Sequence, residues 1–177
     1  MSSIKYGFYG IGNPGKLALT RHSAGNIVLE MVRAAYNLPA FQSVTNGQIS
    51  VGTGILLFQS GVFMNESGRA VVPEIRRHRD TPFAVVHDDL ELKLGAVKVQ
   101  HQGSLKGHNG LRSIAKALGG DAFSRIRIGI GRPSSRDPET VQGYVLSRFT
   151  RDEQRVLEEE TLPQLLEHIE SMISTLT

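Results

Sequence analysis

The feature that most constrains the fold of this chain is an alternation of strand-like and helix-like segments. The run Phe83 to Val86 is continuously apolar, which is typical of a strand buried on both faces of a sheet. In residues 22–37, apolar side chains recur at the spacing of an amphipathic helix. Such alternation predicts an α/β fold with a mixed central sheet, part of it parallel, flanked by helices.

The same patterns predict the remaining elements. Strands are expected over residues 6–11, 54–58 and 96–100, and where Ile126, Ile128 and Ile130 alternate with Arg127 and Gly129, which predicts a strand with one charged face. Helices are expected over residues 65–79, 109–118 and 150–173.

Several residues predict where these helices begin and end. Asn65 and Asn109 are candidate N-caps, and Gly119 follows the last apolar residue of the second helix. Thr150 and Glu153 have the spacing of a capping box. Pro73 predicts either a kink in the 65–79 helix or a helix that begins near it.

Length and composition narrow the class of protein. The 177 residues, 40% of them hydrophobic, predict a single domain over residues 1–177. The absence of Cys excludes disulfides, thiolate metal sites and a cysteine nucleophile. No segment is apolar enough to span a membrane, and Met1 to Lys5 lacks the pattern of a signal or transit peptide.

Charge is unevenly distributed along the chain. The formal net charge is only +3, but residues 96–136 carry eight Lys or Arg and one acidic residue, Asp121. Residues 137–177 carry three basic and nine acidic residues. A basic block of this kind predicts either a solvated face or a surface that contacts phosphates, with the acidic tail turned away from it.

The segment from Gly10 to Gly15 has the spelling G-x-G-x-x-G after a strand, which resembles a dinucleotide-binding turn. In such a fold the helix begins at the third glycine, so that its amides meet the pyrophosphate. Here the helical period begins near Ala24, so a Gly/Pro turn that presents Asn13 is favoured over a nucleotide site.

Two further segments carry groups suited to acid–base chemistry. His22 stands at the start of a helix, where the helix dipole favours the neutral imidazole that a general base requires. Asp88 and Asp89 end a buried strand, where open α/β sheets place their sites. A carboxylate that orients a distant His is favoured over a metal site, since no partner spacing for a metal is present; a polar turn is the alternative.

A glycine-rich segment, Gly103 to Leu111, leads into the next predicted helix and carries Lys106. Backbone amides at a helix start beside a Lys suit a phosphate or another anion. The segment is not a Walker loop, and the chain has no G-x-S-x-G elbow. If the protein is a hydrolase, water is therefore the expected nucleophile.

Together these segments resemble the bacterial-type peptidyl-tRNA hydrolases, whose motifs occur here in order over most of residues 6–150. The matching segments are GIGNPG (Gly10–Gly15), TRHS (Thr20–Ser23), FMNESG (Phe63–Gly68), VVHDDLEL (Val85–Leu92), SLKGHNGL (Ser104–Leu111), RIRIGIGRP (Arg125–Pro133) and GYVLSRF (Gly143–Phe149). The SRDP insertion, Ser135–Pro138, resembles fungal and other eukaryotic members more than bacterial ones.

The resemblance implies a peptidyl-tRNA hydrolase-like fold, related to phosphorylase/hydrolase-like folds, and hydrolysis of the ester between a peptide and tRNA. It implies no metal and no cofactor, and a cytoplasmic or mitochondrial monomer whose partner is peptidyl-tRNA. His22 is then the general base and Asp88 its orienting carboxylate. The resemblance also implies contacts to the substrate, the water or the oxyanion from Asn13, Asn65 and Asn109, a peptide-side wall at Met64, substrate contacts at Gly107 and His108, and contacts to tRNA phosphates from Lys98, Lys106, Arg127 and Arg132.

The chain also departs from the family pattern. The family Tyr after N-P-G is missing, the turn before Thr20 is one residue shorter, and Ser23 replaces an Asn. Residues 38–54 form a shorter stretch than usual, as a trimmed loop would. These departures leave an alternative open: an RNA-binding relative without activity, such as an organellar splicing factor or a ribosome-associated factor.

Overall fold

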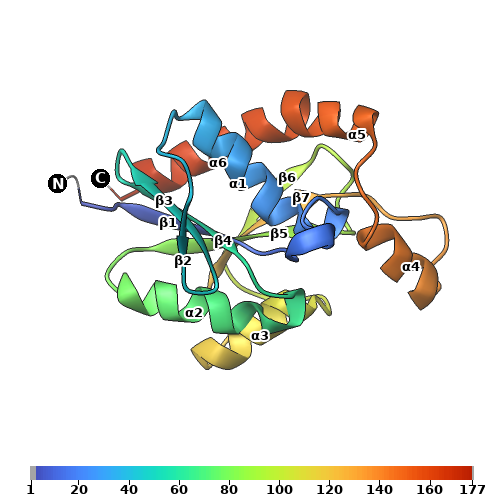
Figure 1. The fold of residues 1–177 in the computed structure, drawn as a ribbon, viewed down its shortest axis with the longest axis horizontal. Helices are drawn as coiled ribbons and strands as arrows, with labels where there is room; N and C mark the ends of the chain where they lie inside the picture. Colours follow the sequence, from blue (N-terminus) through green and yellow to red (C-terminus); the bar gives the residue numbers. More distant parts are fainter. Residues whose placement is uncertain (1–2, 177) are drawn as a thin grey trace.

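A computed structural model describes residues 3–176 of the chain. Its centre is a seven-stranded sheet in the order β2-β3-β4-β1-β5-β7-β6 (Figure 1). The inner strands β4, β1, β5 and β7 run parallel, whereas β2, β3 and β6 pair antiparallel at the edges. The strands are β1 (Tyr6–Gly10), β2 (Gln42–Val44), β3 (Gly47–Gly52), β4 (Ile55–Ser60), β5 (Phe83–Asp89), β6 (Val97–Gln100) and β7 (Ser124–Gly129).

Helices cover both faces of this sheet, which confirms the predicted mixed α/β fold (Figure 1). On one face lie α1 (Ala24–Ala35), α5 (Arg151–Val156) and α6 (Leu162–Ser174). On the other lie α2 (Ser67–Arg77) and α3 (Asn109–Leu118). The short α4 (Pro138–Val145) stands beyond the carboxyl ends of the parallel strands. In residues 3–176 no helix is both long and apolar enough to cross a membrane.

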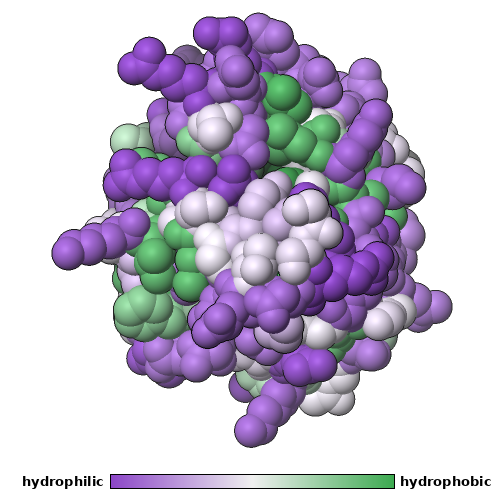
Figure 2. All heavy atoms as spheres, turned by 90° about the vertical axis from the view of Figure 1, so that its right-hand side faces the viewer, coloured by the Kyte–Doolittle hydropathy of each residue, from purple (hydrophilic) through white to green (hydrophobic). Residues whose placement is uncertain are grey.

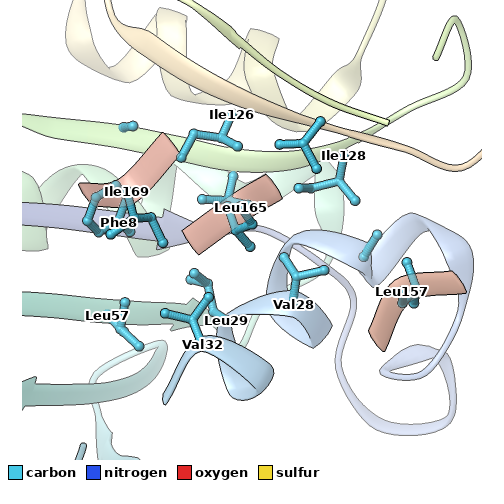
Figure 3. Close-up of a cluster of buried hydrophobic side chains, with 14 of the residues drawn as sticks. Phe8, Val28, Leu29, Val32, Leu57, Ile126, Ile128, Leu157, Leu165 and Ile169 are labelled. Carbon is cyan, nitrogen blue, oxygen red and sulfur yellow. The ribbon is translucent and has the colours of Figure 1, made fainter. Parts of the chain in front are cut away.

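Each face of the sheet buries its own apolar cluster because successive strand residues point to opposite faces. Phe8 packs with α1 and α6 on one side, in the cluster of Figure 3, and its neighbour Tyr9 packs with α2 and α3 on the other. Strand β5 is buried from Ala84 to Asp89, as its continuous apolar run predicts. The carboxylates of Asp88 and Asp89, at the end of β5, are therefore buried within the protein.

Helix boundaries follow the predicted signals in part. The capping box of Thr150 and Glu153 is present, and Gly119 ends α3 in the left-handed conformation at φ 86°. Pro73 lies inside α2, so that helix does not begin near it. The predicted caps at Asn65 and Asn109 are wrong. Glu66 precedes α2 without a side-chain bond, and α3 is capped by the imidazole of His108.

Three elements have no counterpart in the sequence prediction. Residues 38–54, taken as a trimmed loop, contain the hairpin β2–β3, which extends the sheet beyond β4. Helix α4 begins at Pro138 and is capped by the Asp137 carboxylate. The SRDP segment, Ser135–Pro138, thus forms the start of α4. On β7, Arg125 and Arg127 share the face opposite Ile126 and Ile128, and Arg125 on that charged face is only 1% exposed.

Candidate active site

A cleft of about 760 Å³ opens at the carboxyl ends of the parallel strands. Its walls are the end of β5, the loop before α3, the end of β7 and one side of α4. Figure 2 looks onto this end of the molecule, where hydrophilic side chains project around patches of apolar surface. The position is the one in which open parallel sheets place their ligands.

His22 enters this cleft from a 3-10 turn, Arg21–Ser23, that leads directly into α1. The turn lies close to β5 because α1 begins with Ala24 and Gly25. A Cβ atom on Gly25 would stand 2.1 Å from the carbonyl oxygen of Val86, so only glycine permits this approach. The close contact brings His22 within reach of Asp88, two residues after Val86.

Asp88 accepts hydrogen bonds from two imidazoles. Its Oδ2 lies 2.8 Å from Nδ1 of His22, and its Oδ1 lies 2.8 Å from Nε2 of His108. The Asp88 side chain is only 4% exposed, whereas that of His22 is 18% exposed. A buried carboxylate thus has both oxygens engaged, and His22 retains access to the cleft.

These contacts fix the tautomers of the two imidazoles. An ionised carboxylate only accepts hydrogen bonds, so the ring nitrogen that faces it carries the proton. In His22 that nitrogen is Nδ1, which leaves Nε2 with the lone pair that a base needs. In His108 it is Nε2. Its Nδ1 accepts from the backbone N–H groups of Gly110 and Leu111, at 3.1 and 3.3 Å.

The pair shifts the pKa of both His22 and Asp88. Burial alone lowers the pKa of His22, but the charge of Asp88 and the hydrogen bond to it outweigh burial, so the pKa of His22 is raised. Burial raises the pKa of Asp88, and the attraction and hydrogen bonds of His108 and His22 overcome this and hold it well below its usual range. Asp88 is therefore ionised at neutral pH.

A third imidazole, His87, is excluded as a base by its surroundings. Its pKa is lowered to about 3, first by burial and then by repulsion from His108. Its Nδ1 lies 2.8 Å from the backbone oxygen of Asp88. His87 is thus a neutral side chain that packs beside the pair, and His22 is the better placed base.

Asn13 and Ser23 brace the turns next to His22. The backbone N–H of Met64 donates to the amide oxygen of Asn13 at 2.7 Å, so Asn13 offers its NH₂ group as a donor. Ser23 is fully buried, accepts from the N–H of Asn13 at 2.9 Å and donates to the oxygen of Leu17 at 2.8 Å. The Ser that departs from the family pattern thus holds two loops together.

The remaining predicted polar residues differ in placement. Asn109 is exposed, begins α3 and lines the cleft. Asn65 is exposed in the turn Met64–Glu66 but does not line the cleft. Met64 is 5% exposed and belongs to the apolar cluster beneath α2 and α3, so it backs the turn and is not a wall of this cavity.

The predicted basic residues also differ in where they lie relative to the cleft. Lys106 and Gly107 are exposed on the cleft rim. Arg127 lines the cleft, and its Nε donates to Asp89 at 2.7 Å; Arg132 pairs with Glu91. Lys98 is exposed on β6 directly opposite Arg127, so it shares that face of the sheet without lining the cavity.

Part of the basic block, residues 96–136, lines the cleft. Twelve of the cleft-lining residues come from 96–136, and none in the described chain follows Leu146. Five residues of the acidic segment 137–177, all between Pro138 and Leu146 and none of them acidic, also line this cavity, so the segment is not wholly turned away from it. Acidic partners at Asp89 and Glu91 offset part of the positive charge, which the sequence count did not reveal.

The structure gives roles that the sequence analysis did not predict. Asp89 holds Arg127, and Arg21 is buried beside His22. His108, expected to contact substrate, binds Asp88 and caps α3. The ion pairs of Asp89 and Arg21 and the bond from His108 to Asp88 join residues 20 or more positions apart, so membership in the matching segments is their only sequence signal.

His22, Asp88 and His108 also form a set that could hold a metal ion, with ligand atoms within 4.8 Å of one another. In the described residues each Asp88 oxygen instead accepts a hydrogen bond at 2.8 Å from one of the imidazoles. This geometry is that of a carboxylate that orients two imidazoles by hydrogen bonds.

Comparisons with known proteins bear on this arrangement. The family model "Peptidyl-tRNA hydrolase" matches residues 8–177. The chain is 42% identical to the peptidyl-tRNA hydrolase of Geobacter sulfurreducens, over 81% of this chain and 77% of that protein. It is 38% identical to that of Staphylococcus aureus strain JH9, over 94% of this chain and 90% of that protein.

Solved structures agree with the sequence comparison. The crystal structure of peptidyl-tRNA hydrolase from Acinetobacter baumannii superposes with a TM-score of 0.77 at 34% identity. The match covers 89% of this chain and 83% of that one. Fold and sequence thus agree over most of the length, and the chain belongs to the peptidyl-tRNA hydrolase family.

Proposed function

We propose that the cleft hydrolyses peptidyl-tRNA with His22 as general base and water as nucleophile. Nε2 of His22 takes a proton from water as the water oxygen bonds to the ester carbonyl carbon. The tetrahedral intermediate then expels the terminal ribose oxygen of tRNA, which receives a proton from Nε2. The products are tRNA with a free hydroxyl and the peptide acid, which releases its proton to solvent and leaves as a carboxylate.

Asp88 supports this cycle in two ways. It keeps the proton of His22 on Nδ1, so that Nε2 is the basic nitrogen, and it stabilises the imidazolium that forms during the attack. The single observation that carries the proposal is the 2.8 Å contact between Nδ1 of His22 and Asp88 Oδ2 inside the cleft.

Three amide side chains supply contacts for the reacting ester in this proposal: Asn109 in the cleft lining, and Asn13 and Asn65 in turns outside that lining. The NH₂ group of Asn13 and the exposed side chains of Asn65 and Asn109 are donors for the substrate, the water or the oxyanion. The exposed Lys98 and Lys106, with Arg127 and Arg132, face the phosphates of the tRNA. Met64 supports the peptide side of the site through the turn it anchors.

The direct test is turnover of an N-blocked aminoacyl-tRNA by the purified protein. We expect release of free tRNA, with an unchanged rate in the presence of EDTA, because no step uses a metal. The alternative, an RNA-binding relative without activity, predicts tRNA binding with no release. The intact His22–Asp88 pair favours the hydrolase.

The rate should depend on pH through His22. Its protonated form cannot act as a base, so kcat/KM should rise with pH through the pKa of His22, with a midpoint above the ordinary histidine value of 6.5. Because folding raises this pKa, the ion pair with Asp88 stabilises the fold most at low pH and loses that contribution as pH rises through the folded-state value. A kcat/KM profile that is flat between pH 5 and 8 would contradict His22 as the base.

Salt should weaken tRNA binding steeply if the basic block contacts phosphates. The logarithm of the affinity should fall linearly with the logarithm of salt concentration, and Lys106→Ala should reduce that slope by about 1. Lys5→Ala is the matched control, since Lys5 precedes β1 at the opposite end of the sheet. A slope unaffected by Lys106→Ala would place the phosphates elsewhere.

Finer assignments are also part of the proposal. We infer a monomer built as a single domain, located in the cytoplasm or in mitochondria. The relatives described above are bacterial, so a closer relationship to fungal-type members rests on the SRDP segment alone. Size-exclusion chromatography with light scattering would test the monomer.

A further inference from the structure

Arg21, the residue before His22, is buried although it carries a permanent charge. It is only 7% exposed. Its guanidinium donates to both Glu153 oxygens, at 2.9 Å and 2.8 Å from Nη2. The same group lies 4.2 Å above the centre of the Tyr144 ring. Its Nη1 donates to the backbone oxygen of Tyr144 at 3.3 Å and to Ser147 Oγ. A buried charge with this many partners is costly to move.

These contacts join three separate segments. Arg21 belongs to the same 3-10 turn as His22, Tyr144 belongs to the last turn of α4, and Glu153 belongs to the first turn of α5. A backbone hydrogen bond makes a similar connection, because the N–H of Arg21 donates to the backbone oxygen of Ser147, which follows α4, at 3.0 Å. Arg21 is therefore the point at which the His22 turn, α4 and α5 meet.

Glu153 is held in place for this role. Its carboxylate also accepts the backbone N–H of Thr150 at 2.6 Å as part of the capping box. Burial raises the pKa of Glu153, but the bonds from Thr150 and Arg21 outweigh it and the pKa is lowered. The carboxylate is thus ionised and fixed by α5 before it meets the guanidinium, whose planar fork matches it.

Helix α4 needs such an anchor. It has no buried residue of its own, yet Val141, Gln142 and Val145 line the cleft. Besides Arg21, α4 is held by the Tyr144 hydroxyl, which donates to the backbone oxygen of Ile130, and by Tyr144 and Val145, which are partly buried against the apolar cluster. Loss of the guanidinium would remove the side-chain link between one wall of the cleft and the His22 turn, leaving the Tyr144–Ile130 bond and the backbone bond from Arg21 to Ser147.

We propose that Arg21 is a positioning residue whose ion pair with Glu153 and stack on Tyr144 hold His22 and α4 in one fixed arrangement across the cleft. It touches no reacting atom and acts through His22. The proposal rests on the proposed function in that it takes His22 as the base.

The test compares Arg21→Met, Arg21→Lys and Glu153→Gln with the control Arg155→Met. Arg155 pairs with Asp152 on the same helix α5 but is mostly exposed. For Arg21→Met we expect kcat to fall about tenfold to hundredfold, because a small misplacement of a catalytic group has effects of this size. The dissociation constant for tRNA should be unchanged. Arg21→Lys should recover part of the rate, since it keeps the charge without the fork, and Arg155→Met should match the wild type.

Two measurements separate positioning from mere stability. The double variant R21M/E153Q should lose no more rate than R21M alone, because both changes break one pair. Amide exchange without substrate should speed up in residues 138–145 and 20–23 of R21M, measured well below its melting temperature. Unchanged exchange, additive losses in the double variant, or a wild-type kcat in R21M would each overturn the proposal. Failure of the proposed function would instead appear as wild-type turnover in His22→Ala, with the exchange result unaffected.

Discussion

Replacing His22 by Ala should reduce kcat by about 10²- to 10⁴-fold, the range that a positioned general base contributes. Tight tRNA binding should persist, because the exposed basic residues of the cleft rim are untouched. The measurement is release of free tRNA from an N-blocked aminoacyl-tRNA, alongside a binding assay. The matched control is His78→Ala at the end of α2, outside the cleft, which should keep the full rate.

Two other outcomes would contradict His22 as the general base of an active hydrolase. If His22→Ala hydrolyses the ester at the wild-type rate, another group activates the water. His87 is excluded by its lowered pKa, so attention would turn to His108 on the other oxygen of Asp88. If wild type and variant both bind tRNA without releasing it, the chain is an inactive relative.

Replacing Asp88 by Asn should have an effect as large, about 10⁴-fold in kcat, as for other carboxylates that orient a catalytic His. An amide has one accepting oxygen, so only one of the two imidazoles would keep an acceptor. Its NH₂ group facing His22 would select the tautomer with the proton on Nε2, which cannot take a proton from water.

This variant should also change the pH profile. The charge and hydrogen bond of Asp88 are what raise the pKa of His22 against burial. Without them burial dominates, so the acid limb of kcat/KM should move to lower pH while the rate falls. Asp80→Asn is the control, since the Asp80 side chain is 97% exposed and outside the cleft. An acid limb in the same place would show that Asp88 does not set the pKa of His22.

Much of the fold follows from local sequence patterns. The apolar run of β5 and the helical spacing of α1 each reflect burial on a face with a fixed period, so they are readable without tertiary information. The hairpin β2–β3 was missed because only Ser50 of its residues is buried, which leaves little hydrophobic pattern. Helix α4 was missed for the same reason, although Asp137 and Pro138 carry a start signal.

The site was predictable only where motifs could be compared with a family. His22 and Asp88 are 66 positions apart, so no spacing rule brings them together. The cap of α3 shows the limit of local rules. Asn109 is the better cap by residue type, but the carboxylate of Asp88 fixes the His108 ring so that its Nδ1 meets the helix amides. The contact between Asp88 and His108 thus outweighs the general preference for Asn at the N-cap of a helix.

The carboxylate of Asp88 binds two imidazoles that differ in what their second ring nitrogen does. A proton added to His22 goes to the free Nε2 and displaces nothing. His108 uses both ring nitrogens, Nε2 toward Asp88 and Nδ1 toward the backbone N–H groups of Gly110 and Leu111 at the start of α3. Of the two imidazoles that Asp88 binds, His22 is thus the one with a free ring nitrogen, and the acid limb of log kcat/KM should have a slope of about 1 per pH unit, as for a single essential base.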